Sequence, residues 1–333
     1  MTVIVRQPGM LTTIQDFGWR NLLHLSLSRG GAMDSDALAT ANQLIGNPLN
    51  ACGLEFTGVG PTLFFEESLC IAWTGGVMPA VMTRPGPSQP VVLSSHRPVL
   101  IPAGATVRWG AASAGFRCWL AVTGGFNATA LLGSCASHLA AAIGPGPVYR
   151  EQALAVNPAS ESAAAIRAAL SESDADARTW SVATTVPHSW PIIEVAALAG
   201  RHFNQLSEED QRRLLDQGWV VSSSSNRQGL SLKGECLTTT LPNILSEPVR
   251  EGTVQLPPSG LPIVLLAEHQ STGGYPRVLE VLSTEREVLG QAGPSARIVF
   301  RLVSLDQADQ IQVRRRRSIA ALRDAIMSKL QTL

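Results

Sequence analysis

The chain has 333 residues, 45% of them hydrophobic, and its 26 basic and 26 acidic side chains give a formal net charge of zero. This length suits two ordinary domains, and the balanced charge creates no field that would attract nucleic acid or an acidic membrane. The N-terminus lacks a basic and apolar leader, and no apolar run approaches the ~20 residues needed to cross a bilayer, so a cytoplasmic location is expected.

The first helix is predicted directly after Asp34, whose carboxylate suits an N-cap. Leu38, Ala41 and Ile45 then recur at helical spacing, and Gly46 ends the segment. Short β-branched and aromatic segments follow, separated by Gly and Pro turns, at 91–93, 99–101, 106–109 and 117–122. This pattern is typical of barrels or sandwiches, and the four segments together predict an antiparallel meander.

The domain boundary is expected near residues 159–180, which are rich in Ala, Ser, Asp and Glu. Such a composition is typical of a linker or a marginal surface helix. We therefore predict an N-terminal β domain over 1–180 and a C-terminal β domain over 181–312.

In the second half, Ser207 is suited to cap a helix with three acidic residues in its first turn and Gly218 at its end. Strands are predicted at 262–267 and 296–303. The tail, 313–333, repeats apolar residues at helical spacing behind four arginines, which predicts a basic C-terminal helix. The arginine run is interpreted as a solvated helix start or a contact with another protein chain rather than an RNA-binding site.

The cysteines and histidines indicate neither a metal site nor a disulfide framework. The five cysteines are scattered without a CxxC pair, and the histidines form no HxH or HExxH pattern. We expect reduced, mostly buried thiols and no bound metal. A phosphate-binding GxxxxGK[ST] loop is also missing, so any ATP chemistry must take place on a partner.

Three polar, glycine-containing segments are candidates for a binding site. In the first, near the N-terminus, Gln15 and Asp16 could orient a ligand amide, but the residues by themselves favour a strand-edge turn in which Asp and Gly satisfy local backbone. The second is a serine-rich loop with Asn226 and Arg227. The planar guanidinium of Arg227 suits a carboxylate or carbonate, and the alternative interpretation is a flexible surface loop.

The third segment leaves the predicted strand 262–267 and becomes polar at once. Glu268 or His269 could act as acid or base, and Gln270 could bind an amide. Further along, the side chains and the backbone amides of a Gly-Gly loop could complete a site: Thr272, Gly273, Gly274 and Tyr275. For His269 taken alone, a satisfied, half-buried histidine is the favoured interpretation. No GxSxG nucleophile motif is present, so covalent catalysis is not expected.

Several segments in one order resemble the carboxyltransferase subdomain A/B family, which includes the C subunit of 5-oxoprolinase, allophanate-hydrolase subunit 2-like proteins and the Kip antikinase partner. The matching stretches are 6–16 (RQPGMLTTIQD), 30–34 (GGAMD), 41–48 (ANQLIGNP), 53–55, 60–62, 121–125 (AVTGG), 225–229 and 269–276. The resemblance implies a mainly β fold with a few helices and two cyclophilin-like β-barrel domains, subdomain A-like and then subdomain B-like.

The resemblance also implies a function. The chain would be a subunit of an ATP-dependent 5-oxoprolinase-type amidohydrolase that opens 5-oxoproline to glutamate, inactive without a B-like (Kip inhibitor-type) partner protein and an A-like partner protein. No cofactor is expected on this chain, and ATP would bind a partner. The alternatives are a carboxyltransferase subunit that uses carboxybiotin and acts on urea or another small amide, and a non-catalytic regulatory partner of a B-like or Kip-type protein.

The residues that this resemblance places at the site are the same polar ones. The catalytic candidates are Arg227, Glu268 and Gln270, and the substrate-binding candidates are Gln15, Asp16, Asn226, Thr272, Gly273, Gly274 and Tyr275. The chain departs from the family pattern at Cys135 and His138, at Asn226, and at Glu268-His269, where an Asp-Arg pair is usual. The last exchange removes an expected charge pair.

Overall fold

The computed structural model describes residues 1–172, 180–183, 192–238, 241–242 and 244–331. The chain divides into two compact units. The N-terminal unit comprises Met1–Gly18, Asp34–His188 and Ile319–Leu333, and the barrel unit comprises Trp19–Met33 and Ser189–Ser318. The predicted mainly β fold with a few helices is confirmed.

The strands of the N-terminal unit form two antiparallel sheets. The six-stranded sheet has the order β11 (Ala153–Ala155), β1 (Thr2–Gln7), β4 (Thr62–Phe65), β9 (Thr106–Trp109), β6 (Ala80–Thr83) and β7 (Val91–Leu93). The five-stranded sheet has the order β2 (Leu11–Gln15), β3 (Gly53–Thr57), β10 (Ala114–Val122), β5 (Leu69–Val77) and β8 (Val99–Ile101).

Apolar side chains of both sheets share one core, which contains Phe56, Trp73 and Trp109. The ring centroids of Trp73 and Trp109 lie 5.8 Å apart in an edge-to-face arrangement, a geometry that aromatic pairs prefer. This shared core holds the two sheets together.

The predicted meander is wrong, although all four of its strands exist. β7 and β9 belong to the six-stranded sheet, whereas β8 and β10 belong to the five-stranded sheet. Instead of pairing with each other, β8 and β10 lie on either side of β5. The local pattern identifies a strand but not its partner, because hydrogen bonding to a distant strand leaves no mark on periodicity.

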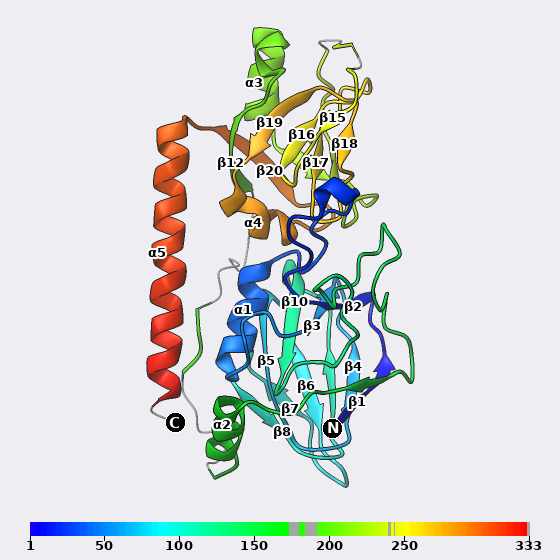
Figure 1. Cartoon of the computed structure of the whole chain (residues 1–333), viewed down its shortest axis with the longest axis vertical. Helices are drawn as coiled ribbons and strands as arrows, with labels where there is room; N and C mark the ends of the chain where they lie inside the picture. Colours follow the sequence, from blue (N-terminus) through cyan, green and yellow to red (C-terminus); the bar gives the residue numbers. More distant parts are fainter. Residues whose placement is uncertain (173–179, 184–191, 239–240, 243, 332–333) are drawn as a thin grey trace. The chain divides into compact units, whose positions relative to one another are not determined.

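Two helices pack on this unit. Helix α1 (Ser35–Leu44) begins where predicted, because Asp34 Oδ1 accepts a hydrogen bond from the Ala37 amide at 2.8 Å. It lies across β5 and β10 (Figure 1). Helix α2 (Glu161–Glu172) forms within the predicted linker and buries Ile166 and Leu170, while the rest of that linker, 173–179, lies outside the described residues.

The strands of the second unit close into a barrel. Its order is β12 (Ile193–Ala199), β19 (Arg277–Val281), β16 (Thr253–Gln255), β17 (Ile263–Leu265), β14 (Gly229–Lys233), β13 (Trp219–Val221) and β20 (Arg297–Leu302). β12 and β20 pair in parallel, and the other neighbours pair antiparallel. A small antiparallel ladder of β15 (Glu247–Pro248) and β18 (Thr272–Gly273) accompanies the barrel.

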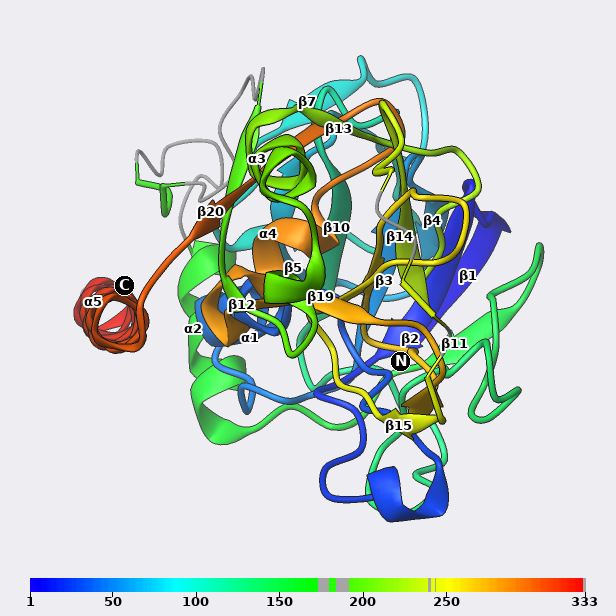
Figure 2. The same ribbon diagram turned by 90° about the horizontal axis from the view of Figure 1, so that it is seen from above.

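The barrel unit also contains short helices. Helix α3 (Glu208–Asp216), capped by Ser207 as predicted, packs on β20 (Figure 2). The others are η1 (Leu23–Leu25), η3 (Phe203–Gln205), η4 (Ser283–Glu285) and α4 (Arg286–Gly290).

The C-terminal helix α5 (Leu305–Leu330) begins before residue 313, where the sequence placed its start. Within the barrel unit, Ala308 and Ile311 pack against a small apolar cluster. Within the N-terminal unit, the Arg323 carbonyl accepts a hydrogen bond from Gln43 Nε2 at 2.9 Å, and Ile326 is buried. None of the described helices combines the length and the apolar character that crossing a bilayer would require.

Candidate active site

Two of the three predicted segments lie side by side in the barrel unit. Gly229 at the start of β14 pairs with Leu265 at the end of β17, so the loops that adjoin these residues meet. The Leu266 amide donates to the Gln228 carbonyl at 2.9 Å, and the Glu268 amide donates to the Arg227 carbonyl at 3.0 Å. Backbone hydrogen bonds therefore fix the Arg227 loop against the Glu268 loop.

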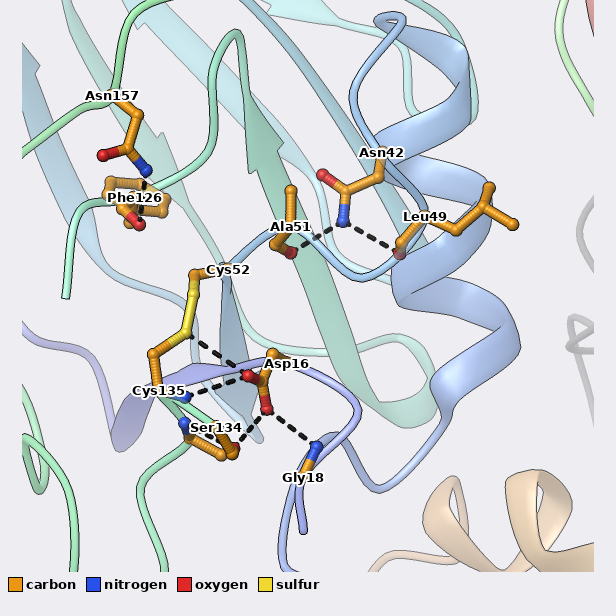
Figure 3. The surroundings of a disulfide bond; sticks show 11 residues. Asp16, Gly18, Asn42, Leu49, Ala51, Cys52, Phe126, Ser134, Cys135 and Asn157 are labelled. Atoms are coloured by element: carbon orange, nitrogen blue, oxygen red, sulfur yellow. Dashed lines mark hydrogen bonds between the residues drawn. A yellow bond between two sulfur atoms is a disulfide. The ribbon is translucent and has the colours of Figure 1, made fainter. Parts of the chain in front are cut away.

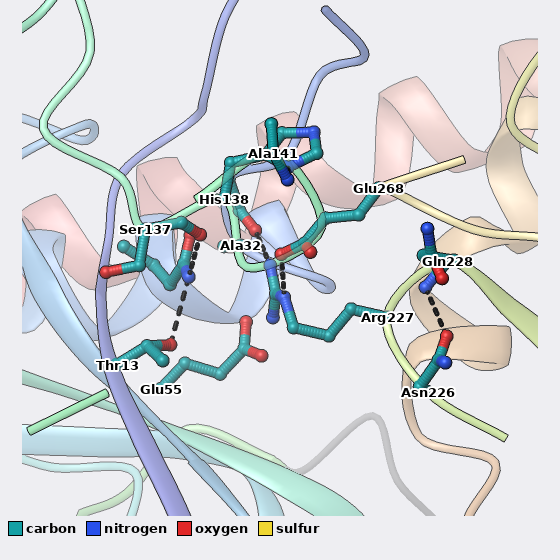
Figure 4. A network of polar contacts seen from close by, with 12 residues as sticks. Thr13, Ala32, Glu55, Ser137, His138, Ala141, Asn226, Arg227, Gln228 and Glu268 are labelled. Atoms are coloured by element: carbon teal, nitrogen blue, oxygen red, sulfur yellow. Dashed lines mark hydrogen bonds and ion pairs between the residues drawn. The ribbon is translucent and has the colours of Figure 1, made fainter. Parts of the chain in front are cut away.

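Arg227 and Glu268 form a buried ion pair (Figure 4). Their side chains are only 4% and 1% exposed, and Arg227 Nε donates to Glu268 Oε1 while its Nη2 donates to the Gly31 carbonyl. The family pattern has an Asp-Arg pair where this chain has Glu268-His269, so a charge pair was expected to be lost there. The ion pair of Glu268 with Arg227 provides a charge interaction in the same loop. The Arg227 guanidinium already donates hydrogen bonds to Glu268 and Gly31. Its binding of a substrate carboxylate or carbonate remains a prediction.

A second charge cluster lies in the same unit around the buried Glu251, with two partly exposed arginines. Arg29 donates to both Glu251 oxygens, at 3.1 and 2.9 Å, and an Arg286 nitrogen lies 3.7 Å away. Burial alone would raise the pKa of Glu251, but the charge and hydrogen bonds of Arg29 and the charge of Arg286 hold it below its ordinary value. The Gly30 amide also donates a hydrogen bond to the Ala267 carbonyl at 2.8 Å. This bond holds the Gly30-Gly31 segment against the loop that carries Glu268.

The surroundings of His269 favour the neutral imidazole over the charged form. Burial lowers the pKa of His269 below its ordinary value, although the Gln270 carbonyl and the charge of Glu251 oppose this. Its Nδ1 lies 2.6 Å from the Gln270 carbonyl oxygen, which can only accept, so Nδ1 carries the proton. The Nε2 lone pair therefore remains available as a proton acceptor.

The remaining residues of this loop are more exposed. Gln270 is exposed, and its Nε2 donates to Gln255 Oε1 at 3.0 Å. The Gly274 carbonyl accepts from the Ile244 amide at 3.0 Å. Thr272 and Gly273 form β18, while Thr272 and Tyr275 have exposed side chains.

Asn226 has a local structural role. Its Oδ1 accepts from the Gln228 amide at 2.8 Å, and its own amide donates to the Gly229 carbonyl at 3.1 Å. These bonds close the turn that precedes β14 and thereby fix the backbone of Arg227.

Gln15 and Asp16 belong to the N-terminal unit. Asp16 Oδ1 accepts from the Gly18 amide at 2.7 Å and from Ser134 Oγ at 2.6 Å, and Oδ2 accepts from the Cys135 amide at 2.9 Å (Figure 3). The Gly18 contact is the local backbone satisfaction that the sequence offered as the alternative to ligand binding, whereas Ser134 and Cys135 lie 118 and 119 residues away in the chain.

Gln15 is fully buried at the end of β2. Its Nε2 donates to Thr13 Oγ1 and to the Ser137 carbonyl, both at 2.9 Å. Across the described ranges its Oε1 has no hydrogen-bond partner. The ligand-binding roles of Gln15 and Asp16 remain predictions.

The expectation of five reduced thiols is wrong for one pair. Cys52 and Cys135 form a disulfide (Figure 3). Cys70, Cys118 and Cys236 are not disulfide-bonded. The two residues are 83 positions apart, so only the packing of the Cys135 loop beside the start of β3 brings them together. In the part of the chain that the structure describes, Asp16 and these two cysteines are the one cluster with metal-ligand atoms in reach, and the disulfide consumes both thiols.

The sequence reasoning missed Arg29, Gln255, Glu251 and Arg286. Arg29 adjoins the Gly30-Gly31 motif and could have been suspected from it. Gln255 is a polar residue between the apolar residues Val254 and Leu256, which is only a weak indication of a functional position. Glu251 and Arg286 stand in no recognisable motif, and only the fold brings them together.

The model of the family described as carboxyltransferase domain, subdomain A and B, matches residues 25–302. The chain belongs to this family. Its match covers both the Arg227 loop and the Gly-Gly loop of the site.

Individual proteins are also similar to this chain. The C subunit of 5-oxoprolinase from Escherichia coli (strain K12) is 31% identical over 311 residues, which cover 92% of this chain and 93% of that protein. The crystal structure of TTHA0988 is 29% identical with a TM-score of 0.73 over 90% of this chain, and the chain spans about half (55%) of its length. The crystal structure of Kluyveromyces lactis urea carboxylase has a TM-score of 0.81 over 96% of this chain and 29% of its own, at 22% identity, and is therefore similar in fold.

Proposed function

We propose that this chain is a subunit of a 5-oxoprolinase-type amidohydrolase, which opens the lactam ring of 5-oxoproline to give glutamate. The observation that carries the proposal is the 31% identity to the C subunit of 5-oxoprolinase across nearly the whole length of both chains. Agreement along the entire length, rather than over one shared domain, favours a common role in a common assembly.

The chemistry of the barrel unit is compatible with an amide substrate. The exposed Gln270 carboxamide offers both a donor and an acceptor, which an amide needs. In its neutral form, which burial favours, His269 can accept a proton through Nε2 when water attacks the lactam carbonyl. The Arg227–Glu268 pair holds the loop that carries both residues in place.

The rest of the reaction is assigned to partners. Lactam hydrolysis is coupled to ATP in this proposal, and ATP binds an A-like partner protein. A B-like, Kip inhibitor-type protein completes the site, and this chain alone is inactive. The proposal involves neither nucleic acid nor a membrane.

The direct test is conversion of 5-oxoproline to glutamate by this chain mixed with its A-like and B-like partners and ATP. Omission of each component in turn is the control, and size-exclusion chromatography establishes that the complex has assembled. Turnover that depends on this chain supports the proposal. An assembled complex without turnover contradicts it.

A second candidate is a carboxyltransferase subunit that moves a carboxyl group from carboxybiotin to urea or another small amide. The similarity in fold to Kluyveromyces lactis urea carboxylase favours it. Carboxybiotin-dependent carboxylation of urea by the assembled complex would support this candidate over the hydrolase.

A third candidate is a non-catalytic partner that regulates a B-like or Kip-type protein. Tight binding to the B-like protein, in a complex that turns over neither 5-oxoproline nor urea, would favour it.

A further inference from the structure

Gln255 is a buried polar residue with a single hydrogen bond to the proposed substrate-binding loop. It ends strand β16 and is 1% exposed, and its Oε1 accepts from Gln270 Nε2 at 3.0 Å. Its own Nε2 is buried and has no hydrogen-bond partner within residues that the structure describes. A buried donor without an acceptor is destabilising, and proteins rarely keep one without a reason.

Gly273 lies directly against this amide. A Cβ atom on Gly273 would come within 2.3 Å of Gln255 Nε2, so any side chain at this position would displace the glutamine. Pairing of β18 with β15, at Gly273 and Glu247, holds the glycine there. The Gly-Gly loop and Gln255 therefore form one packed arrangement next to Gln270.

The hydrogen bond from Gln270 to Gln255 fixes the orientation of the Gln270 carboxamide. It uses one of the two hydrogens on Gln270 Nε2, which leaves Oε1 and the second N–H for other partners. An acceptor and a donor on one edge complement a compound whose own N–H and C=O lie side by side. Lactams and urea have this arrangement, whereas lactones lack the N–H.

We propose that Gln255 is a positioning residue that presents the Gln270 carboxamide to the amide edge of a lactam or urea. The inference rests on the proposed function, because it takes Gln270 as a substrate ligand. Gln255 acts through Gln270, whose carboxamide it orients by the hydrogen bond at its Oε1.

The test compares binding of 5-oxoproline with that of its lactone analogue, in which a ring oxygen replaces N–H, to the assembled complex. The wild-type complex should prefer the lactam by about tenfold, which corresponds to about 1.4 kcal/mol. Gln255→Leu should reduce this preference to about twofold or less. Gly273→Ala, which displaces the same amide, should have the same effect.

Two further variants separate positioning from general damage. Gln43→Leu removes a buried glutamine with one hydrogen bond in the N-terminal unit and should leave the lactam preference unchanged. Gln255→Leu should have no additional effect when Gln270 is already leucine, because Gln255 acts through it. Equal weakening of lactam and lactone binding by Gln255→Leu would overturn the inference.

Urea as a second probe distinguishes failure of the inference from failure of the proposed function. If the complex binds urea in a Gln255-dependent way but does not bind 5-oxoproline, the positioning role stands and the proposed substrate fails. If Gln255→Leu leaves the binding of both amides unchanged, the positioning role is refuted whatever the substrate.

Discussion

Replacing Arg227 by methionine removes the positive charge that the buried Glu268 carboxylate contacts, and it also removes a donor to the Gly31 carbonyl. Breaking one side of a buried ion pair typically costs about 3–5 kcal/mol, because the remaining charge keeps its desolvation cost without its counter-charge. The exposures of 4% and 1% place this pair firmly in the buried class. We therefore expect Arg227→Met to lower the unfolding free energy of the barrel unit by that amount.

Hydrogen exchange measured by mass spectrometry can resolve this loss within one unit. Peptides that cover β14 and β17 should exchange roughly a hundredfold to a few thousandfold faster, if their exchange requires unfolding of the barrel. Peptides from β3 and β10 of the N-terminal unit serve as the internal reference.

A matched control exists in the same unit. Arg301 pairs with Glu194 at 2.7 Å, but their side chains are 44% and 63% exposed. Solvent screening limits such a pair to about 1 kcal/mol or less, so Arg301→Met should change exchange by less than about tenfold. Equal effects of the two substitutions would refute the reasoning from burial.

Three further predictions concern the N-terminal unit. Cys52→Ala opens an 83-residue loop, and the chain-entropy estimate for that length predicts a loss of about 4–5 kcal/mol in unfolding free energy, measurable by urea titration. The disulfide itself predicts three titratable thiols in the denatured, unreduced chain and five after reduction, and five before reduction would contradict it. Burial lowers the pKa of His96 from 6.5 to about 4, so the unfolded chain takes up a proton that the folded one resists, and stability falls as the pH drops from about 6.5 to 4. Because asparagine tolerates the φ of 60° at this position, His96→Asn should fold and should remove about 3 kcal/mol of that loss, and an unchanged pH dependence would exclude His96 as its source.

Local features of the chain were predictable wherever the physical cause is local. The caps at Asp34 and Ser207 lie where predicted, because a side-chain oxygen and an amide three residues later define a helix start. The strand at Val99–Ile101 follows in the same way from apolar, β-branched residues between turn formers. The polar loops after β13 and β17 could be chosen as a candidate site because polar, glycine-containing segments next to apolar strands are unusual.

Long-range pairings were decided by the tertiary structure alone. The distribution of four strands over two sheets, the Cys52–Cys135 disulfide and the contact of Arg227 with Gly31 join residues far apart in the chain. Gln255 shows the limit most clearly, since its single hydrogen bond to Gln270 and its packing against Gly273 exist only because β16 and β18 fold beside each other. By itself the sequence determined where helices and strands form and which loops are polar, because those preferences arise within a few residues. Which distant side chains meet was decided only when the strands paired and buried their apolar side chains. The free energy of strand pairing and apolar burial depends on the whole fold and not on a few neighbouring residues.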